Sequence, residues 1–242
     1  MSGGIGAIIF FWLLWHIVKW LSSPWRRRQA RLRLLGRARD YRLSEERNFA
    51  LALAHPMAFH SIPGGFAGKE RPVLTQELGR TLRPLTLHYF GFRTDLSDAA
   101  ARQQLPAAIK TGWFRRDLDT LQPADQPRQA MALACARSAF FVRCAALLGW
   151  LDEPLQWQVL QLNAARARDC FDSWPAFVRA YAAGRAQWVA ASRGDAVGRA
   201  VTEAEITTWL AARWHPWGRW RWPAPADRKG AGFDLIGSAN GY

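Results

Sequence analysis

Polar capping residues divide much of the chain into stretches whose hydrophobic positions suit α-helices. Ser44 and Asp152 each precede acidic residues, and Thr202 opens a Thr-Glu-Ala-Glu capping box, all typical of helix N-termini. No stretch shows a clean two-residue alternation of hydrophobic and polar positions between hairpin turns, as expected of a strand. The pattern predicts an all-α domain over residues 44–222, an irregular or orthogonal bundle of about seven helices. Two further helices are expected to begin at Thr75 and Ser97.

Proline and glycine set the expected ends of the first three helices. The helix that begins after Ser44 is expected to end at Pro56, and the next to run from about Thr75 to Leu82. The helix after Ser97 is rich in alanine; we expect Pro106 to disturb it and Gly112 to close it.

A long apolar stretch follows Asp125 and Pro127, which open the next expected helix, and it continues to Gly149. It is apolar on nearly every side, so it is either a central core helix or a membrane span. Arg137 and Arg143 would each cost about 2.5–3.5 kcal/mol near the centre of a bilayer. The sequence therefore favours a core helix whose two arginines emerge on its flanks and meet acids.

The stretch CFDSWPAFVRAYAAGRAQW, residues 170–188, is dense in aromatic side chains. Its large residues are spaced by three, four and seven positions, which places them on one face of a helix. Asp172 or Ser173 stands where an N-cap belongs, and Pro175 falls in the first turn. We call this stretch the aromatic motif. Its pattern predicts a structural role in the fold rather than an active site. The residues on this face form an aromatic stripe that consists of Trp174, Phe177, Tyr181, Gly184 and Trp188.

Two residues of the aromatic motif carry more specific expectations. Gly184 costs about 1 kcal/mol of helix propensity relative to alanine, and that cost is best explained by another backbone packing close against it. Arg185 lies beside the stripe, where it can pair with an acid such as Asp169 or bind a ligand phosphate. The pattern favours the structural pair.

The N-terminal region predicts a membrane anchor over residues 1–25. Residues 5–21 are mostly apolar and long enough to cross a bilayer as a helix. Basic residues follow this stretch instead of preceding it, which is the reverse of a signal peptide and keeps the following domain cytoplasmic. The alternative is a buried or interfacial amphipathic helix. His16 lies within the span, near its cytoplasmic end.

The net charge of +14 is concentrated beside this anchor, because residues 19–47 alone carry a net +7. A basic segment next to a membrane is attracted to anionic lipid by about 1 kcal/mol per residue, so the charge gives only weak support for nucleic acid. We expect a basic juxtamembrane segment at residues 26–43. The basic residues expected nearest the membrane surface are Lys19, Arg26, Arg27 and Arg28.

A second aromatic stretch, WHPWGRWRWP at residues 214–223, interleaves tryptophan with arginine. This composition suits lipid headgroups and also base stacking, and one or two of the rings could simply cap the core. We assign Trp217, Trp220 and Trp222 to the membrane surface as an expectation. The tail, residues 223–242, is rich in glycine and alanine and is expected to be disordered.

No cofactor or metal motif is present in the sequence. The loop at residues 62–72 departs from a phosphate-binding loop at Pro63 and Glu70. His55 and His60 have no further ligand type beside them, so we expect no metal site. The three cysteines read as reduced core residues: Cys135, Cys144 and Cys170.

Three segments together resemble a known bacterial family. They are RSAFFVRCAALLGWLDE at residues 137–153, FDSWPAFVRAYAAGRAQW at 171–188, and LHYFGFRTDLSDAAARQQLPAAIKTGWFR at 87–115. They resemble the YbeU/YbeR-type family, domain of unknown function twelve-sixty-six, over roughly residues 82–190. The resemblance implies a bacterial helical domain and no established activity. Leu133 and Ala134 stand where the family is expected to carry a Trp-Asp pair, so a charge role for that acid is absent.

These features favour a single-pass protein of the bacterial inner membrane, with its N-terminus outside and its helical domain in the cytoplasm. We expect an interaction or accessory module that meets anionic lipid headgroups and a protein partner. One alternative is a nucleic-acid-binding protein. The other is a hydrolytic enzyme whose groups would come from Asp169, Asp172, Ser173, Arg185 and His215.

Overall fold

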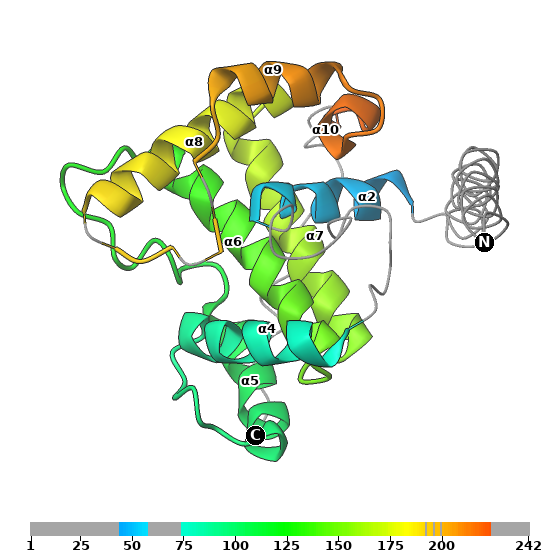
Figure 1. Ribbon diagram of the computed structural model, residues 1–242, viewed down its shortest axis with the longest axis vertical. Helices are drawn as coiled ribbons and strands as arrows, with labels where there is room; N and C mark the ends of the chain where they lie inside the picture. Colours follow the sequence, from blue (N-terminus) through cyan, green and yellow to red (C-terminus); the bar gives the residue numbers. More distant parts are fainter. Residues whose placement is uncertain (1–43, 58–73, 192, 196, 199, 224–242) are drawn as a thin grey trace, which may run out of the picture. The chain divides into compact units, whose positions relative to one another are not determined.

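The computed structural model describes residues 44–57, 74–191, 193–195, 197–198 and 200–223 (Figure 1). Within these ranges the chain forms helices and no strand, which confirms the all-α expectation. The expected anchor, the basic juxtamembrane segment, the loop at residues 62–72 and the tail beyond Pro223 lie outside the described residues, as do His16 and His60.

The helices occur in a simple order along the chain, and several have the capping residues expected from the sequence. The side chains of Ser44, Ser97 and Thr202 each accept a hydrogen bond from a backbone N–H in the first helical turn. Thr202 and Glu205 complete the capping box reciprocally. The helices are α2 (Glu45–Ala52), α4 (Gln76–Tyr89), α5 (Asp98–Gly112), α6 (Pro127–Leu147), α7 (Glu153–Cys170), α8 (Trp174–Ala190), α9 (Glu203–Ala211) and α10 (Pro216–Arg219).

Several expected boundaries were wrong by part of a turn or more. Helix α2 ends at Ala52, before Pro56, and α4 continues through Pro84 to Tyr89 instead of stopping near Leu82. Helix α5 also contains a proline, Pro106, but it ends at Gly112, where the sequence expected it to close. A proline removes one backbone donor and bends a helix without always ending it, and burial of Leu87 and Tyr89 after Pro84 favours continuation of α4.

Helix α6 is the core helix of the described domain, and it contacts α2, α4, α7 and α8. Its residues from Ala132 to Ala145 are all buried. By length and hydropathy α6 could cross a membrane, but 78 % of that window is buried inside the fold. Arg137 and Arg143 do not emerge on the flanks as expected, because their exposures are only 9 % and 2 %.

Helix α8 packs directly on α6, and Gly184 makes this approach possible. A methyl group at Gly184 would overlap the backbone carbonyl of Gln129 on α6. This is the close backbone neighbour that the cost of a mid-helix glycine suggested. Trp174, Phe177 and Tyr181 are buried on the same face of α8, so this part of the aromatic stripe faces the core.

Candidate functional site

A chain of buried charged side chains joins α6, α8 and two loops. The Arg137 guanidinium donates through Nε to Asp117, at 2.8 Å, and through Nη1 to Asp195, at 3.4 Å. Arg185 donates through Nε to the second oxygen of Asp195, at 2.6 Å. The side-chain exposures of Asp117 and Asp195 are 5 % and 1 %. Since a buried charge is tolerated when it is paired and hydrogen-bonded, these four side chains depend on one another.

Tyr89 extends this buried charge chain to the end of α4. Its hydroxyl donates to Asp117 at 2.9 Å, and its ring stacks on Phe141 with 4.1 Å between the centroids. Burial raises the pKa of Tyr89, and the Asp117 carboxylate raises it further, so the hydroxyl remains a proton donor. Burial opposes the charge of Arg137, but Asp117, Tyr89 and Asp195 outweigh it and raise the pKa of the guanidinium.

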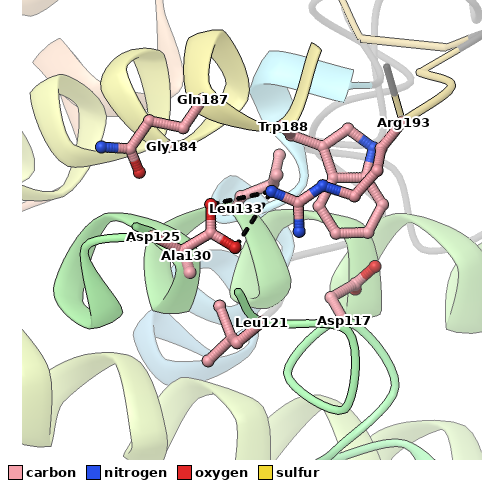
Figure 2. Close-up of a pocket in the computed structure, with 9 residues that line it drawn as sticks. All are labelled: Asp117, Leu121, Asp125, Ala130, Leu133, Gly184, Gln187, Trp188 and Arg193. Carbon is pink, nitrogen blue, oxygen red and sulfur yellow. Dashed lines mark hydrogen bonds and ion pairs between the residues drawn. The ribbon is translucent and has the colours of Figure 1, made fainter. Parts of the chain in front are cut away.

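A small cavity lies beside the buried charge chain, and a second ion pair spans it. Figure 2 shows Arg193 reaching Asp125, with an Nη2–Oδ1 distance of 2.8 Å, while the Arg193 guanidinium lies 4.4 Å from the centre of the Trp188 ring. The cavity measures about 10 Å³, which is room for no more than about one water molecule. The arrangement therefore holds the loops around α6 and α8 together and offers no space for a substrate.

The polar residues of the aromatic motif are occupied by structural contacts. Ser173 is the N-cap of α8 and accepts from the Ala176 N–H, and its hydroxyl donates to Asp172 at 2.9 Å. Trp188 donates its indole N–H to the Gly194 carbonyl at 3.0 Å. Arg185 forms a structural pair, but its partner is Asp195 instead of the suggested Asp169.

The residues considered for hydrolysis do not converge on one cavity. Arg185 lies roughly 18 Å further along α8 than Ser173, at 1.5 Å per residue. Ser173 lines an open groove, whereas Arg185 pairs with Asp195. Asp169 is exposed near the end of α7. His215 is fully buried, and its ring stacks on Trp209 with 5.1 Å between the centroids. A nucleophile, a base and an orienting acid would need to lie within hydrogen-bond reach of each other.

Histidine and cysteine side chains in the described ranges give no metal-binding cluster. His55 lies beside His215, with 4.1 Å between the ring centroids, in a cage with Trp209 and Trp217. The Nδ1 atom of His215 accepts from the Trp217 backbone N–H at 3.2 Å. Burial lowers the pKa of His215 to about 4, so the ring is neutral at pH 7.

The cysteines behave as buried thiols. Cys135 and Cys144 are buried and Cys170 is half-buried, and all three are free. Burial raises the pKa of each thiol, that of Cys135 to about 11. A thiol that stays protonated at pH 7 is a poor nucleophile.

An open groove brings together the two tryptophan-rich stretches of the sequence. It has a volume of about 420 Å³ and lies where the first turn of α8 meets the end of α9 and the segment that contains α10. We call it the Trp-Arg groove. Its lining residues are Ser173, Trp174, Pro175, Leu210, Trp217, Gly218, Arg219, Trp220, Arg221 and Trp222.

The tryptophans of this groove differ in exposure. Trp217 is buried, at 3 % exposure, and donates its indole N–H to the Ala52 carbonyl of α2 at 3.1 Å. This ring caps the core, which was one of the three interpretations of the segment, and it is not placed to meet a headgroup. Trp220 and Trp222 are half-buried. Trp222 packs edge-on against Phe49 and Trp174, with centroid distances of 4.9 Å in both cases.

Hydrogen bonding fixes the backbone of the groove. Trp174 donates its indole N–H to the Trp220 carbonyl at 2.7 Å, which ties the C-terminal segment to the start of α8. Gly218 packs so closely on the end of α9 that a methyl group there would overlap the carbonyls of Ala212 and Leu210. Both contacts fix the backbone that carries Arg219 and Arg221 at the groove.

The sequence alone did not reveal the acids that meet Arg137 and Arg185. Asp117 lies in the turn after α5, and Asp195 in the loop between α8 and α9. Asp125 was expected to open α6, but Gln126 is the N-cap and Asp125 instead pairs with Arg193. The only available signal was that an arginine inside an apolar helix needs a carboxylate partner.

A comparison with protein families gives a match over most of the described domain. A model of a protein family matches residues 79–222, and its description is Protein of unknown function (DUF1266). No curated protein and no solved structure matches the chain. The matched range includes the buried charge chain and the whole Trp-Arg groove, and it extends beyond the residues 82–190 that carried the resemblance. Because the match covers more than half of the 242 residues, the chain belongs to this family of proteins of unknown function.

Proposed function

We propose that the protein is a membrane-anchored helical module of the bacterial inner membrane that acts by binding a protein partner and anionic lipid rather than by catalysis. Its N-terminus would lie outside and its helical domain in the cytoplasm. The proposal includes its membership in the YbeU/YbeR-type group, which rests on the three sequence segments given above. The anchor itself rests on the apolar stretch before Leu21 and the basic residues that follow it.

One observation about the fold supports binding over catalysis. The side chains that could have formed a hydrolytic site are used for architecture: Ser173 caps α8, Arg185 neutralises Asp195, and His215 is buried among aromatic rings. Catalysis by such groups requires that they meet at a cavity open to a substrate. The hollow beside Arg137 and Asp117 has room for only about one water molecule.

The nucleic-acid alternative receives less support from the groove. Base stacking needs an accessible aromatic face, whereas Trp217 is buried and Trp222 is surrounded by Phe49 and Trp174. The ring of Trp220 has the Arg219 guanidinium 4.8 Å from its centroid. These tryptophans are therefore better suited to walls of a groove than to a platform for successive bases.

A topology experiment tests the proposed function. A reporter that is active only in the cytoplasm, fused to the C-terminus of the full chain, should give a signal, and the fusion should remain in the membrane fraction after alkaline carbonate extraction. A matched fusion that lacks residues 1–25 should be released. A full-length fusion that is soluble, or a C-terminus that reports from the outside, would contradict the proposal.

A further inference from the structure

Positive charge predominates in the lining of the Trp-Arg groove, which includes Arg219 and Arg221. Arg219 and Arg221 are exposed, and neither forms an ion pair with any residue that the structure describes. Between Ile206 and Pro223 the sequence contains three arginines and no acidic residue. The groove therefore carries positive charge that its own segment does not neutralise.

The remaining polar groups at the groove are mostly donors as well. The indole N–H groups of Trp220 and Trp222 donate to no acceptor among the described residues, whereas those of Trp174 and Trp217 are already used. Ser173 donates its hydroxyl to the exposed carboxylate of Asp172, which places one negative charge beside the groove against the two arginines. A ligand that fits these groups must bring acceptors and negative charge, which describes a phosphate or a carboxylate.

Apolar surface lies beside these donors. Pro175 and Leu210 line the groove together with the tryptophan rings, and the volume of about 420 Å³ is within the usual range for a small-molecule site. A free inorganic anion would leave this surface in contact with water. A molecule that joins a phosphate to an apolar body would cover both parts of the groove.

We propose that the Trp-Arg groove binds the headgroup of an anionic phospholipid, with Arg219 and Arg221 on the phosphate and the indole and proline surfaces against the glycerol and upper acyl region. This inference rests on the proposed function, in which the domain faces the inner leaflet, and it names the site on the domain that meets the lipid. Tryptophan and arginine are the side chains that suit this layer of a membrane, because the indole ring is amphipathic and the guanidinium pairs with phosphate.

The architecture accounts for why the site would be specific instead of a diffuse attraction. The carbonyl of Trp220 is held by Trp174, and Gly218 permits the close seat of α10 on α9. The backbone of Arg219 and Arg221 is thereby fixed on either side of Trp220. Arg213 provides a natural comparison, since it is exposed in the same C-terminal segment and does not line the groove.

The test uses the full chain in nonionic detergent micelles, titrated by calorimetry with short-chain phosphatidylglycerol. Short-chain phosphatidylcholine, which has no net charge, should bind at least tenfold more weakly. A basic side chain near an anionic surface contributes about 1 kcal/mol, and 1.4 kcal/mol is a tenfold change. Arg219→Gln and Arg221→Gln should therefore each weaken binding about fivefold and the double variant about thirtyfold, whereas Arg213→Gln should change it less than about twofold.

Folding of the variants is checked by thermal unfolding. It should be nearly unchanged, because neither arginine makes an ion pair within the described residues and the Arg219 guanidinium contacts the ring of Trp220, which is itself only half-buried. An equal effect of Arg213→Gln would overturn the groove in favour of diffuse basic charge, as would unchanged binding by the double variant. Inorganic phosphate that binds as tightly as the lipid would overturn the lipid assignment in favour of a small anion. Binding of a single-stranded oligonucleotide that depends on Arg219 and Arg221, with lipid binding unaffected, would overturn it in favour of nucleic acid.

The experiment separates this inference from the proposed function. Carbonate extraction of the double variant reports on the anchor alone, because residues 1–25 are unchanged. A chain that is released from the membrane contradicts the anchor and leaves the micelle titration valid. A chain that stays in the membrane but shows no dependence on Arg219 and Arg221 contradicts only the groove.

Discussion

Replacing Gly184 by alanine tests whether the aromatic motif is scaffold. The added methyl group would overlap the carbonyl oxygen and carbon of Gln129, which belong to the α6 backbone and cannot rotate away. Overpacking of a core costs about 1–3 kcal/mol, while the change from glycine to alanine in a helix returns about 1 kcal/mol. The net loss is thus about 0–2 kcal/mol. Because the clash is with backbone, we expect the upper half of that range, and Gly184→Leu should lose more.

The assay is thermal unfolding of the full chain in detergent, followed by far-ultraviolet circular dichroism. One kcal/mol corresponds to a shift in Tm of about 2–4 °C for a domain of this size. Gly79→Ala is the matched control, because its new methyl group would meet only the Leu74 side chain, at 3.8 Å. The control should gain up to about 1 kcal/mol. If Gly184→Ala were as stable as the control, the inferred contact between α6 and α8 would be refuted.

Three further changes probe the core and the buried charges. Trp174→Ala should lose about 3–5 kcal/mol in the same melts, since its ring is buried and its N–H holds the Trp220 carbonyl; stability equal to the parent would contradict the scaffold role. Asp195→Asn removes the carboxylate that pairs with Arg185 and leaves Arg137 with Asp117 alone, so it should lose about 3–5 kcal/mol. Asp119→Asn, in an exposed pair, should lose less than about 1 kcal/mol. Burial lowers the pKa of His215 from 6.5 to about 4, so the unfolded chain takes up this proton first, and stability present above about pH 6.5 should fall by roughly 3 kcal/mol towards pH 4. In urea melts across that range His215→Phe should show a smaller fall, and an unchanged slope would refute the assignment.

Local features were predictable from the sequence because their causes lie within one helical turn. Ser97, Ser173 and Thr202 act as N-caps, and each does so through a hydrogen bond to a residue three positions later. The close backbone contact at Gly184 was also predictable, because a glycine in the middle of a helix lowers helix stability and tertiary packing must compensate for that loss. These predictions required no knowledge of which helices become neighbours.

Features that depend on tertiary neighbours were not predictable in the same way. Asp195 rather than Asp169 meets Arg185, because the loop after α8 folds back over α6, and no local pattern distinguishes the two acids. Trp214 is 68 % exposed while Trp217, three residues later, is 3 % exposed. Their contexts are similar in sequence, and the tertiary contacts of Trp217 separate them: its hydrogen bond to Ala52 and its packing against the rings of Trp174 and Trp209.

The candidate site could not be assembled from the sequence for the same reason. The sequence pattern singled out both halves of the site, but separately. One is the Ser-Trp-Pro start of α8, and the other is the Trp-Arg segment around α10. Their meeting depends on the hydrogen bond between Trp174 and Trp220 and on the packing of α10 against α9. A long-range contact of this kind joins residues more than forty positions apart.

The two ends of α8 make different contacts, but residues at both ends are needed for folding. Substitutions in α8 therefore cannot separate a loss of function from a loss of stability. Near its start, Trp174 is buried and also positions the backbone of the groove, so a change there alters folding and ligand binding together. Near its end, Arg185 neutralises a buried carboxylate, so its loss acts through stability as well. Arg219 and Arg221 are exposed and make no ion pair within the described residues. Loss of a cellular role in those two variants, with unfolding unchanged, would therefore report on the groove itself, whereas the same loss in a variant of the aromatic motif would not.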